Sequence, residues 1–143
     1  MDFQRFIDNG RKKRKMLKNF QVLKNSKGWS DVDIDGYYFT GLYRGKKVSV
    51  MGDVLYHMHF NKGIRTTVVV LRDESDISKN TILDSEIQRI LLGMNSPQKA
   101  KLIVDAKSVN YVEGDSIDDL GRLLRIIDTL CDFTDKFGGL KES

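Results

Sequence analysis

Residues 47–60 constrain the fold most strongly, because apolar and polar side chains alternate there almost without interruption. Even positions, from Val48 to Phe60, are apolar except for Gly52, whereas odd positions are mostly polar. Successive side chains of a β-strand point to opposite faces, so one face of this segment is apolar and the other is largely solvated. The sequence therefore predicts a half-buried strand, long or bent at Gly52, in a sheet that is covered on one face.

The preceding segment extends this sheet as an antiparallel meander. A strand is predicted over 32–43, with Gly36 and Gly41 as points where it bulges or bends. Arg44-Gly45 is typical of a tight turn between this strand and the next one.

A third strand is predicted over 64–71. It follows a three-residue hairpin loop at Asn61-Lys62-Gly63, where the glycine can adopt a positive φ. Residues 68–71 are apolar on both faces, which is typical of a central strand. The polar stretch 72–79 is expected to be a loop.

Beyond residue 79 the sequence predicts a helix and then a second hairpin. The helix over 82–92 begins at Asn80 or Thr81 and is ended by Gly93. Residues 101–113 are expected to form the hairpin. Ser96-Pro97 also suits the start of a short helix, so residues 97–105 are either strand or short helix.

The last predicted helix, over 116–137, has the clearest apolar face. Ser116 and Asp119 form a capping-box-like start, and Gly138-Gly139 ends the helix. Its apolar residues recur at spacings of three and four, so the helix is expected to cover a sheet or another helix. These residues are Leu120, Leu123, Leu124, Ile127, Leu130, Cys131 and Phe137.

The N-terminal segment, residues 1–27, is helical by composition and strongly basic. It holds nine basic residues against two acidic ones, a local charge of +7, whereas the remainder of the chain carries −3. Lys13 and Arg14 fall on the apolar helical stripe, so either the helix breaks near Asn9-Gly10 or these side chains snorkel at the edge of the stripe. We expect this helix to be peripheral. The stripe consists of Phe3, Phe6, Ile7, Leu17 and Phe20.

Together these elements predict an α+β fold in the order α-β-β-β-α-β-β-α, with a twisted antiparallel sheet of about five strands and helices packed on one face. We divide the chain into a basic N-terminal helical segment, 1–27, and a single α+β domain, 28–143. The helices over 82–92 and 116–137 are expected to cover the apolar face of the central strand. That face presents Val48, Val50, Val54, Tyr56, Met58 and Phe60.

An acidic segment matches only half of a calcium-binding loop. Asp31, Asp33 and Asp35 followed by Gly36 fit its first six positions, but the twelfth is Leu42, where an EF-hand requires glutamate. We therefore predict a strand whose Val and Ile side chains point inward and whose aspartates point outward.

The two histidines and the single cysteine complete no metal or catalytic motif. His57 and His59 lie on one face of a strand, but a closed metal site needs further ligands. Cys131 lies on an apolar helix face and is expected to pack in the core. We expect no metal, no cofactor and no catalytic residue. An enzyme of unrecognised type is the last of three functional alternatives, after a protein-binding protein and a nucleic-acid-binding protein.

The basic run Arg11-Lys12-Lys13-Arg14-Lys15, with Lys18 after it, is the feature with a definable ligand class. Clustered basic side chains neutralise phosphates, so these six residues are a candidate anion-binding site for nucleic acid. The same cluster suits an anionic membrane surface or an acidic protein. The alternative is a solvated helix face that pairs with the acidic remainder of the chain.

Residues 41–50, with the sequence GLYRGKKVSV, resemble a segment of uncharacterised, largely archaeal proteins with the pattern G-x-Y-x-G-[RK]-x-V-x-V. In those proteins a helix, a hairpin and a final amphipathic helix follow, as predicted here, and the resemblance covers about residues 31 to 137. The element order is also similar to that of type III secretion chaperones, which are small dimeric α/β proteins that hold an unfolded stretch of a partner. This second likeness is an analogy of fold. Such chaperones are usually acidic, and the basic first helix departs from them.

We interpret the chain as a non-enzymatic protein-binding or adaptor protein, chaperone-like in form, whose partner is another protein or a second copy of itself. Nucleic-acid binding through the basic helix is the alternative. The lone cysteine favours a reducing compartment, and the N-terminus lacks the apolar region of a signal peptide. The longest aliphatic run is 68–71, too short to span a bilayer. We therefore expect a cytoplasmic protein.

Overall fold

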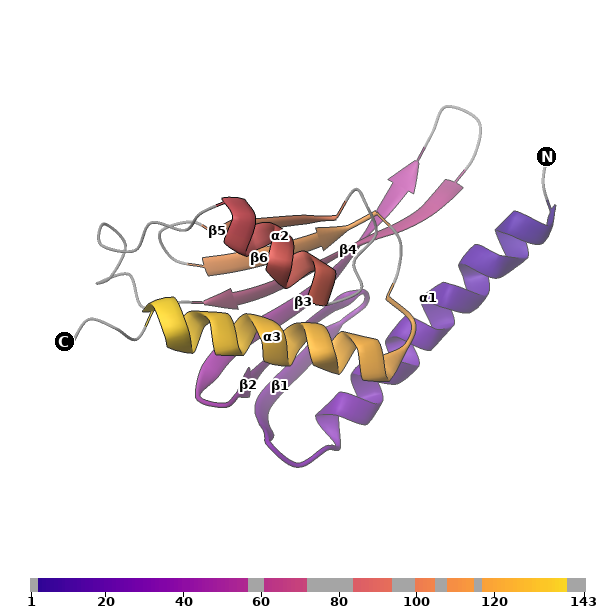
Figure 1. Ribbon diagram of the computed structural model, residues 1–143. Helices are drawn as coiled ribbons and strands as arrows, with labels where there is room; N and C mark the ends of the chain where they lie inside the picture. The colour runs from indigo at the N-terminus through magenta and orange to yellow at the C-terminus, as the bar shows by residue number, and fades with distance from the viewer. Residues whose placement is uncertain are drawn as a thin grey trace.

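The computed structural model describes residues 3–56, 61–71, 84–93, 100–104, 108–114 and 117–138. These residues form a six-stranded sheet with helices in front of it (Figure 1). The strand order is β1-β2-β3-β4-β6-β5, and every neighbouring pair is antiparallel. The α+β class is therefore confirmed. The predicted order and the count of about five strands are each short by one strand, because the elements run α-β-β-β-β-α-β-β-α.

The helices are α1 (Phe3–Lys24), α2 (Asp84–Gly93) and α3 (Leu120–Gly138). The strands are β1 (Trp29–Asp35), β2 (Tyr38–Tyr43), β3 (Lys46–Tyr56), β4 (Asn61–Leu71), β5 (Lys101–Val104) and β6 (Ser108–Glu113).

The missed strand results from a hairpin inside the single strand that was predicted over 32–43. Asp35 pairs with Tyr38, so two residues form the loop between β1 and β2. The first of them, Gly36, has a φ of 57°, a conformation that glycine adopts without steric cost. Gly41 lies within β2 instead, where an added Cβ would come within 3.0 Å of the Trp29 ring. Its role is to permit this close packing.

Of the next two predicted turns, one is present and the other is not. The tight turn at Arg44-Gly45 is confirmed, and both residues have positive φ angles, 55° and 76°, as a type I′ hairpin turn requires. The loop predicted at residues 61–63 is wrong, because all three residues belong to β4. Leu55 pairs with Gly63 and Tyr56 with Asn61, which leaves one extra residue on β4. The glycine therefore lies beside a β-bulge, where its flexibility is also useful.

The alternation of β3 is confirmed where its side chains are described. Val48 and Val50 are fully buried, and Ser49 and Met51 between and after them are half-buried. The remaining predicted positions on the apolar face (Val54, Tyr56, Met58 and Phe60) have side chains outside the described part of the chain, as do His57 and His59. β4 lies between β3 and β6, so the prediction of a central strand is also confirmed.

In the C-terminal half, the second hairpin and the last helix are present. β5 and β6 pair as predicted, with Leu102 opposite Tyr111, so residues 101–104 are strand. The helix predicted over 82–92 begins at Asp84 in the described residues, and its predicted start at Asn80 or Thr81 lies outside them, as does the loop over 72–79. The cap of α3 is Asp119, whose Oδ1 accepts hydrogen bonds from the backbone nitrogens of Gly121, at 3.0 Å, and Arg122, at 3.4 Å. Ser116 lies outside the described residues.

The first helix corrects two expectations. α1 is continuous across Gly10, so it does not break there. Its second half is not peripheral, because Met16, Phe20 and Leu23 are almost fully buried in the core. The ring centroids of Phe20 and Phe39 are 5.3 Å apart, which joins α1 to β2. Of the predicted stripe, Phe20 is buried and Leu17 packs against the core, whereas Met16 and Leu23 were missed. The side chains of Phe3, Phe6 and Ile7 lie outside the described residues.

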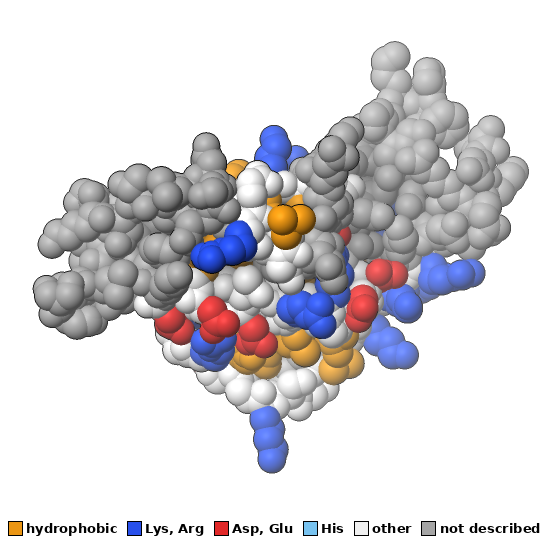
Figure 2. All heavy atoms as spheres, in the orientation of Figure 1, with side chains coloured by type: hydrophobic (Ala, Val, Ile, Leu, Met, Phe, Trp, Pro, Cys, Tyr) orange, Lys and Arg blue, Asp and Glu red, His pale blue; other side chains and the backbone are white. Residues whose placement is uncertain are grey.

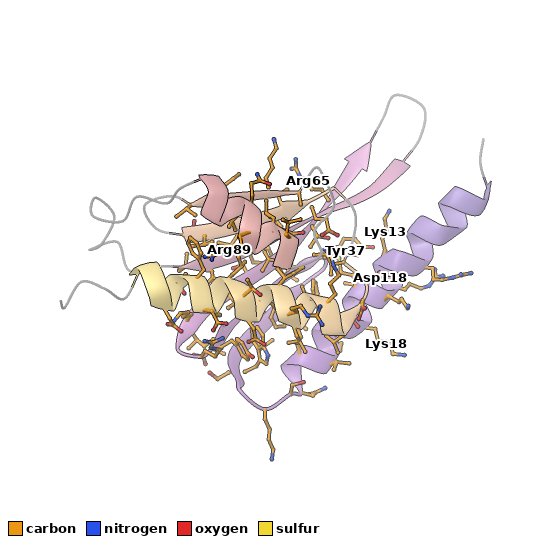
Figure 3. The ribbon with its side chains drawn as sticks, viewed as in Figure 1. Lys13, Lys18, Tyr37, Arg65, Arg89 and Asp118 are labelled. Atoms are coloured by element: carbon orange, nitrogen blue, oxygen red, sulfur yellow. The ribbon has the colours of Figure 1, made fainter. Side chains whose placement is uncertain are left out.

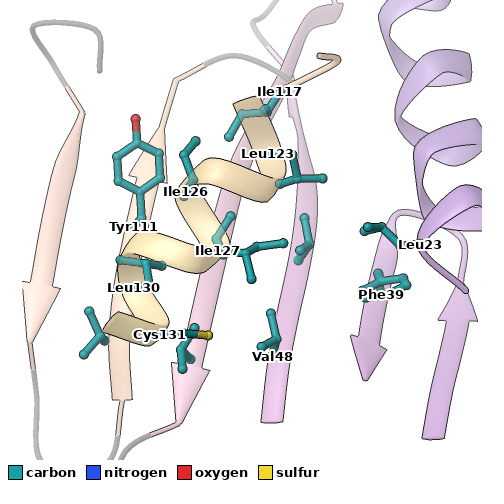
Figure 4. Packing of buried hydrophobic residues seen from close by; sticks show 14 of the residues in the cluster. Leu23, Phe39, Val48, Tyr111, Ile117, Leu123, Ile126, Ile127, Leu130 and Cys131 are labelled. Carbon is teal, nitrogen blue, oxygen red and sulfur yellow. The ribbon is translucent and has the colours of Figure 1, made fainter. Parts of the chain in front are cut away.

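One hydrophobic core fills the space between the helices and the sheet. Figure 4 shows α3 over the strands, with Ile126, Ile127 and Leu130 pointing toward them. These three side chains and Cys131 have no exposed area, so the predicted core position of the cysteine is confirmed. The core therefore covers one face of the sheet. The other face of the sheet and the outer sides of the helices remain available for contacts.

Candidate interaction surfaces

The described helices all lie on one face of the sheet, so the other face is bare of described helices. In Figure 1 this second face is turned away from the viewer. Its side chains follow from strand register, because neighbours across a ladder point to the same side. One row crosses all six strands: Asp35, Tyr38, Met51, Thr67, Val112 and Lys101. The adjacent row is Asp33, Thr40, Ser49, Val69, Asn110 and Ile103. We call these twelve residues the uncovered face.

Burial separates this face sharply from the covered one. All twelve residues are exposed or half-buried, whereas Phe39, Val50, Val68 and Tyr111 on the covered side have no exposed area. Several large apolar side chains nevertheless point outward. Tyr38 is 41% exposed and Ile103 is 48% exposed. At the margin of the face, Leu42 and Leu71 also remain exposed. These four exposed apolar side chains lie on three strands of the same face, two of them on β2, and half-buried Met51, Val69 and Val112 lie between them. An extended apolar surface of this kind is typical of a site that contacts another molecule.

The charges of the uncovered face are separated. Both aspartates are on β1, at one edge of the sheet, and Lys101 is on β5, at the other edge. The four strands between them contribute only uncharged side chains to the two rows. Within these two rows the acidic side chains lie at the β1 edge and the basic one at the β5 edge. Lys47 on β3 and Arg65 on β4 are exposed on the same side of the sheet just beyond the rows, so the central strands also carry basic charge.

The six predicted anion-binding residues do not form one cluster. Arg11, Arg14, Lys15 and Lys18 are exposed, and their spacing places them along one outer side of α1. We call these four residues the basic stripe, and in Figure 2 Lys and Arg side chains are seen along this helix. Lys13 is half-buried and leaves α1 on a different side from Lys18 (Figure 3). The side chain of Lys12 lies outside the described residues.

Acidic side chains of α3 are engaged by the turn between β2 and β3. Arg44 Nη2 lies 2.7 Å from Asp132 Oδ1 and 3.1 Å from Asp135 Oδ2, and Lys46 pairs with Asp135. The hydrogen bond from Lys46 lowers the pKa of Asp135. Tyr43 donates a 2.7 Å hydrogen bond to Asp128 Oδ1, which raises the pKa of the tyrosine to about 12. These contacts hold α3 against the sheet, and such partly exposed pairs add little stability each.

A second polar cluster is buried at the other end of α3. Glu113 is 4% exposed, and Arg122 binds it with both nitrogens, at 2.8 Å for Nη1–Oε2 and 2.5 Å for Nη2–Oε1. Tyr111 donates a 2.6 Å hydrogen bond to Glu113 Oε1. The hydrogen bond to Glu113 raises the pKa of Arg122. This cluster joins β6 to α3, and its groups satisfy one another, so we assign it to folding.

The aspartates of the partial calcium-loop motif lie on β1, and the single cysteine lies on α3. Asp31, Asp33 and Asp35 are exposed along β1, while Val32 and Ile34 pack against the core, as predicted. Among the described residues, no group of His, Cys, Asp and Glu is arranged to hold a metal ion. Burial raises the pKa of Cys131 to about 11, which leaves its thiol protonated at neutral pH.

Comparisons with known proteins find no relative of this chain. No family model, no curated protein and no solved structure matches this chain. The resemblances to archaeal proteins and to type III secretion chaperones therefore stay predictions. Within the described helices, none is both long and apolar enough to cross a membrane.

Proposed function

We propose that this protein is a non-enzymatic binding protein that engages another polypeptide through the uncovered face of its sheet. One observation supports the proposal above the others: large apolar side chains stay exposed on one face of a six-stranded sheet whose other face carries the hydrophobic core. Burial of apolar area is the dominant favourable term in most protein association. In the chaperone-like form of the proposal, the partner contributes an unfolded stretch. The lone cysteine supports a reducing compartment such as the cytoplasm.

Photo-crosslinking from two matched positions tests the proposal. A benzoylphenylalanine at position 103 lies on the uncovered face, and one at position 92 lies on α2, where Leu92 is 76% exposed. Both replace an exposed, large apolar residue, so they differ mainly in the face that they sample. We expect the purified full chain, irradiated in extract of its source organism, to form discrete polypeptide adducts from position 103 and few from position 92. Equal yields from both positions, or none from 103, contradict the proposal.

A second candidate function is nucleic-acid binding through the basic stripe. The observation that favours it is the exposure of four basic side chains along one side of α1. Phosphate contacts of this kind give affinity that is independent of base sequence and falls steeply with salt.

Alanine at Arg11, Arg14, Lys15 and Lys18 tests the second candidate. If the four residues of the stripe each bind a phosphate, anisotropy of labelled single-stranded and duplex oligonucleotides shows binding that weakens about 10²-fold between roughly 50 and 200 mM salt. The fourfold variant then loses this binding while its melting temperature barely changes, because exposed substitutions cost little stability. Alanine at Lys24 and Lys27, which are exposed beyond the stripe, is the control. Binding that survives the fourfold change removes the stripe as the site.

A further inference from the structure

The geometry points to double-stranded DNA as the ligand of the basic stripe, with α1 lying along the major groove between the two phosphate backbones. The inference rests on the second candidate function and names its ligand. It does not compete with the uncovered face, because α1 packs on the other side of the sheet, where Phe20 meets Phe39 in the core.

The stripe carries positive charge that the protein itself does not neutralise. Its four side chains are exposed, and none of them forms an ion pair with another described residue. Residues 9–30 contain no acidic residue. In Figure 1 the N-terminal half of α1 extends clear of α3, whose start meets α1 at Asn19 through a 2.9 Å hydrogen bond to the carbonyl oxygen of Asp118. The stripe is therefore available to an anion from solution.

The four basic side chains cover an arc of the helix and not a single line. Successive residues of an α-helix are turned by about 100°, so Arg11 and Lys18, two turns apart, lie on nearly the same line. By the same geometry Arg14 lies about 50° to one side of that line and Lys15 about 50° to the other. Phe20, on the opposite side of α1, has no exposed area. The arc therefore points away from the core.

A duplex groove fits this arc. An α-helix with its side chains is about 10–12 Å across, and the major groove of B-form DNA is about 12 Å wide. When Arg11 and Lys18 face the floor of the groove, Arg14 and Lys15 point toward the phosphate backbones that form its two walls. Cations on both flanks of one helix thus match a ligand that has phosphates on both sides.

Two other anionic ligands match the stripe less well. Proteins that bind single strands stack the bases on aromatic side chains, but Tyr38, the one exposed aromatic side chain in the described part of the chain, points to the opposite side of the sheet. Helices that bind a membrane surface bury apolar side chains beside their basic ones. From Arg11 to Lys18, every side chain that the structure describes as exposed is basic.

Matched nucleic acids test the inference. By anisotropy at about 50 mM salt, we expect the full chain to bind a DNA duplex of about two helical turns at least about tenfold more tightly than an RNA duplex of the same length and base order. Both duplexes carry the same number of phosphates, but the major groove of A-form RNA is too deep and narrow to admit the helix. One strand of the DNA alone should also bind at least about tenfold more weakly than the duplex.

Salt dependence assigns the contacts on the two flanks. Arg14→Ala and Lys15→Ala should each reduce the slope of log K against log salt by about 0.9, because each removes one phosphate contact. Lys24→Ala, an exposed basic residue in the last turn of α1, should leave the slope unchanged. Circular dichroism establishes that each variant is folded.

The outcomes separate the inference from the function on which it rests. An RNA duplex or a single strand that binds as tightly as the DNA duplex overturns the inference and keeps the second candidate function. Unchanged salt slopes in both flank variants also overturn the inference. Absence of binding to all three nucleic acids overturns both, and sedimentation with vesicles of phosphatidylserine and phosphatidylcholine would in that case assign the stripe to a membrane surface.

Discussion

Replacing Phe39 by alanine is expected to lower the free energy of unfolding by about 3–5 kcal/mol. Phe39 has no exposed area and lies at the meeting point of α1, β1 and β2. Its ring centroid is 5.3 Å from that of Phe20 and 5.2 Å from that of Trp29. Truncation loses the transfer free energy of the ring and leaves a cavity that these large neighbours cannot fill without moving. Urea unfolding followed by circular dichroism measures the change.

The control for this prediction is the neighbouring residue in β2. Tyr38 points to the uncovered face and is 41% exposed, so Tyr38→Ala removes a ring of similar size from the opposite side of the same strand. In the isolated monomer we expect Tyr38→Ala to cost about 1 kcal/mol or less, as surface substitutions usually do. Equal losses at both positions would mean that the sheet is covered on both faces.

Replacing Arg122 by alanine is expected to lower the free energy of unfolding by about 3–5 kcal/mol, because it leaves a buried charge without its counter-ion. Glu113 is 4% exposed, and its carboxylate accepts hydrogen bonds from Nη1 and Nη2 of Arg122. Arg122→Lys should restore only part of the loss, since an ammonium group cannot reproduce the bidentate geometry. Thermal and urea unfolding at neutral pH measure both variants.

A double-mutant cycle and a control one turn away make this prediction specific. In a Glu113→Gln background, Arg122→Ala should cost clearly less than in the wild type, because no buried carboxylate remains to be neutralised. Arg125→Ala, in the next turn of α3 and exposed, should change stability by about 0.5 kcal/mol or less. Additive effects of the Glu113 and Arg122 substitutions would contradict the assignment of this pair to one cluster.

Much of the fold was predictable because local periodicity and burial agree. Val48 and Val50 alternate with polar neighbours and are buried, and the hairpin of β5 and β6 follows the same rule. The errors fall where two structures suit the same residues. Gly36 suits both a bulge within a strand and the first position of a two-residue turn between two strands, so the glycine alone did not decide between them. Gly63 suits both a loop and a bulge, and only strand pairing decides between them.

The surfaces were less predictable than the fold. The basic run was visible in the sequence, but which of its side chains are exposed depends on the side of α1 that is packed, and Met16 and Leu23 on that side were overlooked. The uncovered face was visible only as the polar side of single strands. Its rows combine residues from six strands, so Asp35 and Lys101 share a row through pairings that no local pattern contains.

Crosslinking from position 103 against position 92 tests the central claim most directly, because it asks which face of the molecule another polypeptide touches. The account predicts that the probe at 103 forms discrete polypeptide adducts, and that the more exposed site at 92 forms far fewer. Adducts that form equally from both positions, or from position 92 alone, would contradict the claim that the uncovered face of the sheet is the binding surface.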